Sequence, residues 1–186
     1  MNTMVTVLLL ATAGCSADGA SDTGEPVSAE ARPYVDALSA QFTLDGEGDF
    51  GLDDDRATCL ATRWVSVLEP ARLEGAGIEP TDFGVGPGDQ SEAQLADVGL
   101  SDGEATAMVD AFGGCRIDLK AMTLDNLLGP LSDDERSCLD DAVSDDLIGD
   151  YFKAVFTVPS EDLDSDPASK DYVVATEPCI GEDDGD

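Results

Sequence analysis

Two nine-residue segments of this chain share a pattern that places a cysteine near the start of a helix. Residues 52–60 and 131–139 both read Leu-x-Asp-Asp-x-x-(Thr/Ser)-Cys-Leu. A polar residue ahead of an acidic turn is typical of a helix N-terminus, because side-chain oxygens cap free backbone N–H groups and carboxylates favour that end of the helix dipole. The pattern predicts that Cys59 and Cys138 each lie in the second turn of a helix. Any disulfide they form would restrict which helices can be neighbours.

The amino terminus has the features of an export signal. Residues 5–13 form an apolar run of nine residues, which is too short to cross a bilayer as a helix but suits the core of a signal peptide. Ala13 and Gly14 precede Cys15, and this arrangement resembles the lipobox of bacterial lipoprotein precursors. Thr12 stands where that family usually has leucine, and no lysine or arginine precedes the run.

The resemblance to lipoprotein precursors implies that the thiol of Cys15 carries a diacylglycerol group and that the peptide before it is removed. The alternative is an ordinary secretory signal with an incidental cysteine. Residues 15–27 are small, polar and turn-prone, as expected of a flexible tether. The chain after this tether resembles small acidic secreted proteins of high-GC Gram-positive bacteria that have paired cysteines.

Four cysteines remain once Cys15 is assigned to lipid. An even number in an exported chain predicts two disulfides, with three connectivities open. The segments before Cys115 and Cys179 also match loosely, which indicates two related units that each begin and end with a cysteine helix. The simplest pairing is then within units, Cys59 with Cys115 and Cys138 with Cys179. Chance similarity between two acidic helix starts is the alternative to duplication.

Helical periodicity dominates the chain after the tether, and no segment shows the sustained alternation of a strand. We therefore predict an all-α fold in which two related, disulfide-linked helical units pack as one small bundle-like domain behind a flexible N-terminal tether. Helices are predicted over 28–42, 53–68, 91–98, 102–112, 117–128 and 145–157, with others starting at Pro70, after Ser132 and after Asp166. The predicted organisation is a signal peptide at 1–14, the tether at 15–27, units at 28–115 and 116–180, and an acidic tail at 181–186.

The charge balance and the lack of histidine exclude several functions. The chain has 41 acidic and nine basic residues, a net charge of −32, and no histidine. Such a field repels phosphate backbones and anionic lipid headgroups, so nucleic acid is not an expected partner. Without histidine, Ser-His-Asp and Cys-His catalysis and histidine-ligated zinc are excluded.

One acidic loop suggests calcium. Asp45, Glu47 and Asp49 alternate with glycines, as oxygen ligands do in calcium loops. An EF-hand, however, requires glycine where Phe50 stands and a bidentate glutamate where Arg56 stands. The alternative is a polar loop between helices.

Other candidate residues have structural interpretations that we favour. Trp64 lies in an apolar stripe, and Tyr151, Phe152 and Phe156 form an aromatic cluster, so all four are expected in the core. Adjacent aspartates could ligate cations or serve in catalysis, but the helix dipole already accounts for those in first turns. These pairs are Asp133-Asp134, Asp140-Asp141 and Asp145-Asp146.

The sequence therefore predicts a cell-envelope protein anchored to the membrane through lipid on Cys15. We expect a non-enzymatic binding or structural module with an envelope protein or the cell wall as its partner and with no cofactor. The alternatives are a calcium-binding or buffering protein and, behind it, an envelope enzyme that uses carboxylates.

Overall fold

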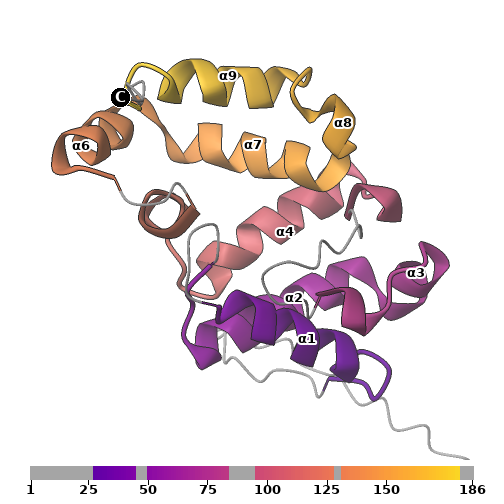
Figure 1. Cartoon of the computed structure of the whole chain (residues 1–186). Coiled ribbons are helices and arrows are strands. Elements are labelled where there is room, and N and C mark those ends of the chain that lie inside the picture. The colour runs from indigo at the N-terminus through magenta and orange to yellow at the C-terminus, as the bar shows by residue number, and fades with distance from the viewer. Residues whose placement is uncertain (1–26, 45–49, 84–94, 128–130, 181–186) are drawn as a thin grey trace, which may run out of the picture.

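The computed structural model describes residues 27–44, 50–83, 95–127 and 131–180, and within these ranges the chain is helical and has no strand, as predicted (Figure 1). The nine α-helices are α1 (Arg32–Phe42), α2 (Asp54–Leu68), α3 (Pro70–Gly75), α4 (Asp102–Gly114), α5 (Leu119–Met122), α6 (Asp133–Ala142), α7 (Asp145–Thr157), α8 (Ser160–Leu163) and α9 (Pro167–Thr176). Short 3₁₀ helices cover Pro80–Phe83 and Leu95–Val98, and one π turn covers Thr123–Leu127.

Local capping sets where most of the long helices begin. Asp53, Ser132, Ser144 and Asp166 each accept a hydrogen bond from a backbone N–H in the first turn of the helix that follows. Ser101 does the same for α4, and its own backbone N–H is bound in return by the Glu104 carboxylate. These caps satisfy N–H groups that have no partner inside the helix, which explains why the sequence predicts these starts closely.

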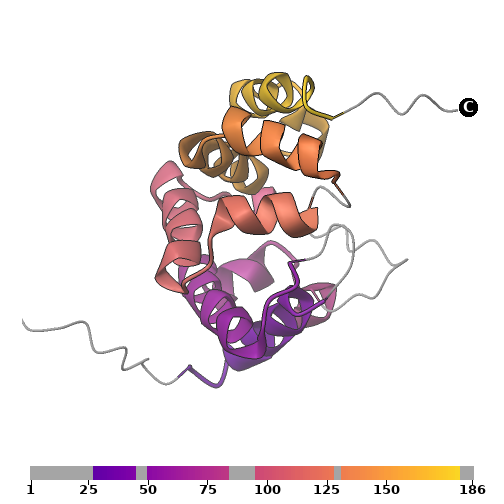
Figure 2. The ribbon, with the colours of Figure 1, turned by 90° about the vertical axis from the view of Figure 1, so that its left-hand side faces the viewer.

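The helices form two layers joined by α4. Figure 1 shows α1, α2 and α3 together on one side and α7, α8 and α9 on the other, with α4 crossing between them. A quarter turn of the molecule shows the same separation, with α6 on the side of α9 (Figure 2). Helix α4 packs on α2 in the first layer and on α7 in the second, so the two predicted units share one core.

Trp64 lies at the centre of this core. Its side chain is 3 % exposed, and its indole N–H donates a 3.0 Å hydrogen bond to the Met108 carbonyl. The ring lies 5.0 Å from that of Phe42, 5.7 Å from Phe112 and 5.1 Å from Phe156, centroid to centroid. One residue thus joins α1, α2, α4 and α7, which confirms its predicted place in the core.

The three aromatic residues of α7 were also predicted to lie in the core, and two of them do. Phe152 and Phe156 are buried, whereas Tyr151 is only half-buried and stacks on Tyr172 of α9, with 4.4 Å between ring centroids. Burial raises the pKa of the Tyr172 phenol to about 12 and also raises that of the Tyr151 phenol.

The structure contains the two disulfides of the predicted pairing, Cys59–Cys115 and Cys138–Cys179, with Cα atoms 5.7 and 5.4 Å apart. Cys59 and Cys138 are each the sixth residue of a helix, α2 and α6. Their partners lie at or just past the end of a later helix, α4 or α9. The two bridges therefore have the same local arrangement, as the repeated sequence pattern indicated.

Several helix bounds differ from prediction. Helix α1 starts at Arg32 instead of Ser28. A turn at residues 29–31 precedes it, and there the Ser28 hydroxyl and carbonyl accept hydrogen bonds from the backbone N–H groups of Ala31 and Arg32, as a helix cap does. Residues 80–83, which lie outside the predicted helices, form a 3₁₀ helix, and the short α8 was not predicted.

The end of α4 also differs from prediction. It continues through Gly113 and Gly114, where a stop was expected. In the segment that ends α4, the residue with a positive φ is Arg116, at 61°. Backbone bonds from Arg116 to Gly113 and from Ile117 to Phe112 close the helix there.

Candidate functional site

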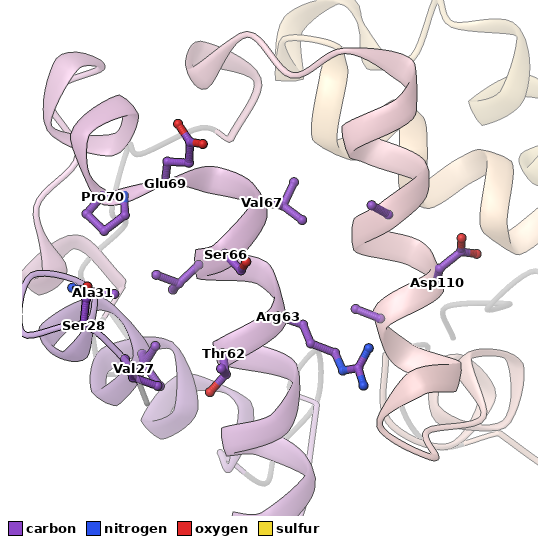
Figure 3. Close-up of a pocket in the computed structure, with 14 residues that line it drawn as sticks. Val27, Ser28, Ala31, Thr62, Arg63, Ser66, Val67, Glu69, Pro70 and Asp110 are labelled. Atoms are coloured by element: carbon purple, nitrogen blue, oxygen red, sulfur yellow. Dashed lines mark hydrogen bonds between the residues drawn. The ribbon is translucent and has the colours of Figure 1, made fainter. Parts of the chain in front are cut away.

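A groove of about 660 Å³ lies over the outward face of α2, between the start of α1 and the middle of α4 (Figure 3). Helix α2 buries Leu60, Ala61, Trp64, Val65 and Leu68, which leaves the remaining residues of this stretch on its outward face. Thr62, Arg63, Ser66 and Val67 of α2 line the groove, and small side chains of the turn before α1, of α1 itself and of α4 form its walls. Its volume is within the range of roughly 300–1,000 Å³ that is usual for ligand sites.

Arg63 is the basic side chain of this groove. Figure 3 shows it extending from α2 toward α4. Five of the nine basic residues form ion pairs with described carboxylates, and Arg63 is not among them. Its guanidinium packs against Gly114, where an added Cβ atom would lie 2.8 Å from Nη1. This position, at the C-terminal end of α4, favours a cation because of the helix dipole.

Two carboxylates stand at the edges of the groove. Glu69 joins α2 to α3 with a φ of 56°, and Asp110 lies on α4. In Figure 3 the Asp110 carboxylate points away from Arg63, and Glu69 points outward at the far end of the helix. Thr62 and Ser66 lie on α2 within the groove, and their hydroxyls make no hydrogen bond to other described residues. The groove thus offers one guanidinium and the hydroxyls of Thr62 and Ser66 among apolar side chains, with two carboxylates at its edges.

A second hollow, of about 490 Å³, lies where α4, α7 and α9 meet. It is lined by Lys153 and by Asp102, Asp150, Asp166 and Asp171. Asp166 caps α9, and Asp150 pairs with Lys153 at 2.5 Å. In the part of the chain that the structure describes, no group of three or more acidic, cysteine or histidine side chains is arranged to hold a metal ion.

The predicted site residues fall into three groups. Cys15 and the proposed calcium ligands Asp45, Glu47 and Asp49 lie outside the described residues, so both assignments remain predictions. The four other cysteines are bonded in pairs, as described above. The paired aspartates of α6 and α7 are all exposed and were correctly interpreted as surface residues. These are Asp133, Asp134, Asp140, Asp141, Asp145 and Asp146.

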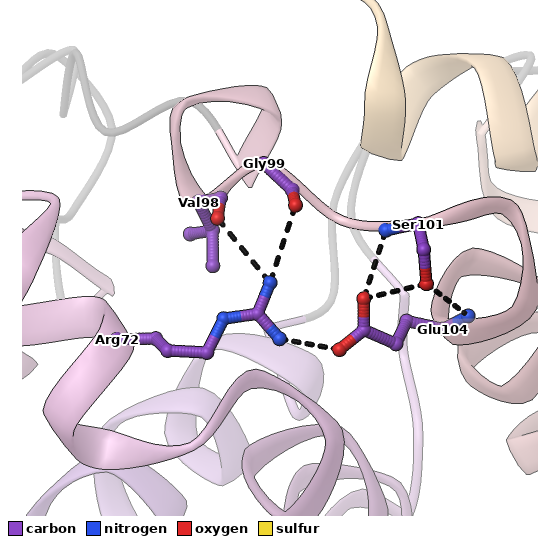
Figure 4. Close-up of polar contacts among 5 residues, drawn as sticks. All are labelled: Arg72, Val98, Gly99, Ser101 and Glu104. Carbon is purple, nitrogen blue, oxygen red and sulfur yellow. Dashed lines mark hydrogen bonds and ion pairs between the residues drawn. The ribbon is translucent and has the colours of Figure 1, made fainter.

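Arg72 and Glu104 form a polar network that ties α3 to the start of α4 (Figure 4). The Arg72 guanidinium pairs with the Glu104 carboxylate and donates bonds of 3.3 and 3.2 Å to the carbonyls of Val98 and Gly99. The hydroxyl and backbone N–H of Ser101 donate to the other carboxylate oxygen at 2.7 and 2.8 Å. The pKa of Glu104 is lowered from 4.5 to about 2, mainly by the hydrogen bonds from Ser101 and, to a smaller extent, by the hydrogen bond from Arg72.

This network predicts a specific dependence of stability on pH. Because the folded-state pKa of Glu104 is depressed, its stabilisation is complete above the ordinary value of 4.5 and is lost as pH falls toward 2. We expect wild type to be more stable than Glu104→Gln at about pH 6 and the difference to shrink by about pH 3. Urea unfolding of both proteins at each pH measures it. Glutamine retains the cap, so a difference that is independent of pH would contradict the assignment.

Sequence reasoning did not find the groove. The stretch from Thr62 to Val67 is part of an amphipathic helix whose polar face looks like ordinary solvent-exposed surface. The one available signal is that this face of α2 has hydroxyls and one arginine in a chain so rich in carboxylates. The walls come from α1 and α4, which only the tertiary structure brings alongside.

None of the helices in the described ranges combines the length and the apolar composition that crossing a bilayer requires. Comparison with protein-family models, with curated protein sequences and with solved structures finds no match. The cysteines, the charge distribution and the groove are therefore the features that indicate a function.

Proposed function

We propose that this chain is a lipid-anchored protein of the bacterial cell envelope and acts there as a non-enzymatic binding module. The observation that carries the proposal is the use of the cysteines. The chain has five, and the two disulfides account for four of them. The two disulfides indicate an extracytoplasmic protein, because such bonds persist in oxidising compartments. Cys15, directly after the apolar run, is the cysteine left for lipid.

The surface chemistry favours binding over catalysis. Carboxylate catalysis needs at least one acid in a water-excluded pocket, where burial raises its pKa. In the described residues the buried polar side chains are Thr123, Ser169 and Thr176, and no aspartate or glutamate is buried. Each of these three hydroxyl groups lies on a helix or turn inside the core. The groove beside Arg63, of about 660 Å³, is a concave surface of a size that a partner segment can occupy.

Mass spectrometry tests the anchor. Cells that produce the full chain are fed an alkyne fatty acid, and the intact protein is measured before and after reduction. We expect acyl label in wild type and in Ser16→Ala, no label in Cys15→Ser, and a gain of four hydrogen atoms on reduction because there are two disulfides. A mature wild-type chain with an unmodified Cys15 thiol would disprove the anchor.

Site-specific photo-crosslinking tests the binding role in intact cells. A photoreactive residue at Ser66 lies in the groove, and one at Asp141 lies exposed on α6 as the matched control. We expect a discrete cross-linked product from position 66 and none of that mass from position 141. Displayed protein that yields no product from the groove position argues against a binding module.

A further inference from the structure

We propose that the groove over α2 binds the carboxyl-terminal end of a partner polypeptide, with about three apolar residues in the groove and the terminal carboxylate on Arg63. This inference extends the proposed function by naming the chemistry of the partner. The charge, the polar groups and the length of the groove support it separately.

The charge of the groove favours a single carboxylate as the ligand. A guanidinium can donate two parallel hydrogen bonds to one carboxylate. Arg63 has no ion pair with a described residue, and its guanidinium packs against the backbone of Gly114. The Glu69 and Asp110 carboxylates at the edges would repel a second negative charge nearby. A peptide segment with several acidic residues is therefore a poor ligand, whereas a single terminal carboxylate can pair with the Arg63 guanidinium.

The polar groups of the groove favour a peptide over a fatty acid. An acyl chain would cover the Thr62 and Ser66 hydroxyls without giving them a hydrogen bond, which costs free energy. A peptide has N–H and C=O groups that these hydroxyls can bind. Val27, Val67 and the alanines of α4 would contact its apolar side chains.

The length of the groove sets the length of the ligand. Its floor runs along α2 from Thr62 to the end of that helix at Leu68, and Glu69 and Pro70 continue it into α3. At 1.5 Å per residue the six steps within α2 span about 9 Å. An extended peptide advances about 3.3 Å per residue, so about three residues occupy the groove. Residues further from the carboxylate lie over the acidic surface, where the net charge of −32 favours lysine or arginine.

Peptide binding to the purified full chain tests the inference. The probe is a fluorescent peptide pool with two lysines and a glycine followed by three positions drawn from alanine, valine and leucine. It is made with a free carboxyl terminus and, separately, with a terminal amide. We expect saturable binding of the free acid by anisotropy at physiological ionic strength, and at least about tenfold weaker binding of the amide, the loss of a charge-assisted hydrogen bond.

Two variants and a matched control connect binding to Arg63. Arg63→Gln removes the charge, and Gly114→Ala shifts the end of the Arg63 side chain, because its Cβ would lie 2.8 Å from Nη1. We expect Arg63→Gln to weaken binding of the free acid about tenfold or more and Gly114→Ala to weaken it less, because the flexible guanidinium can move at low cost. Gly113→Ala, one residue earlier in the same helix, has no atom within 4 Å of its new Cβ and should bind as wild type does. Circular dichroism checks that all three fold.

Three results would overturn this inference. They are equal binding of the acid and amide pools, no saturable binding of either, and tighter binding of laurate than of the peptides. None of them bears on the lipid at Cys15 or on the cross-link from Ser66. Failure of the peptide assignment and failure of the proposed function are therefore distinguishable.

Discussion

Replacing Trp64 by alanine is expected to lower the free energy of unfolding by about 3–5 kcal/mol, the usual cost of deleting a large aromatic side chain from a core. The indole is 3 % exposed and contacts rings from α1, α4 and α7, so the cavity left behind would border four helices at once. The Met108 carbonyl would also lose the hydrogen bond from the indole N–H. No single helix can shift to fill the space without losing contact with another.

Urea unfolding followed by far-ultraviolet circular dichroism measures this loss, since the variant no longer has the only tryptophan of the chain for fluorescence. Trp64→Phe retains an aromatic ring and should lose less than the alanine variant. Val174→Ala is the surface control, because Val174 is 68 % exposed on α9, and a change within about 0.5 kcal/mol is expected there. If Trp64→Ala unfolds at the same urea concentration as the control, Trp64 does not organise the core.

The second large effect is expected on removing either disulfide. The bridges close loops with sequence separations of 56 and 41 residues. In the chain-entropy model each bridge contributes about 4 kcal/mol, and the first exceeds the second by about 0.3 kcal/mol because loop entropy grows only with the logarithm of length. The expected losses are large against the 5–15 kcal/mol that is typical of whole domains.

The paired variants Cys59→Ala/Cys115→Ala and Cys138→Ala/Cys179→Ala test this expectation by urea unfolding. Alanine is preferred to serine because Cys115 and Cys179 are buried, and a new hydroxyl there would add a cost of its own. The losses should be greater at low ionic strength, where repulsion within a chain of net charge −32 is screened least. Paired variants as stable as wild type would show that packing alone holds the helices together.

The starts of α2, α4, α6, α7 and α9 were predictable because the information is local. A capping side chain such as Ser101 or Asp166 is two or three residues from the N–H groups it satisfies, so the short sequence pattern contains the whole interaction. The end of α4 was less predictable. Gly113 and Gly114 would ordinarily stop a helix, but here bonds at Arg116 and Ile117 close the helix two residues further on.

The sequence by itself determined the helical class, the starts of the capped helices, the place of Trp64 in the core and the pairing of the cysteines, because these depend on residues close together or on a pattern that occurs twice. Only the tertiary structure decided that α4 joins the two layers and that α1 and α4 flank the outward face of α2. The environment of Arg63 depends on this packing of helices. Its groove walls and Gly114 come from helices distant in sequence, and the relative placement of helices is set by how their buried faces pack.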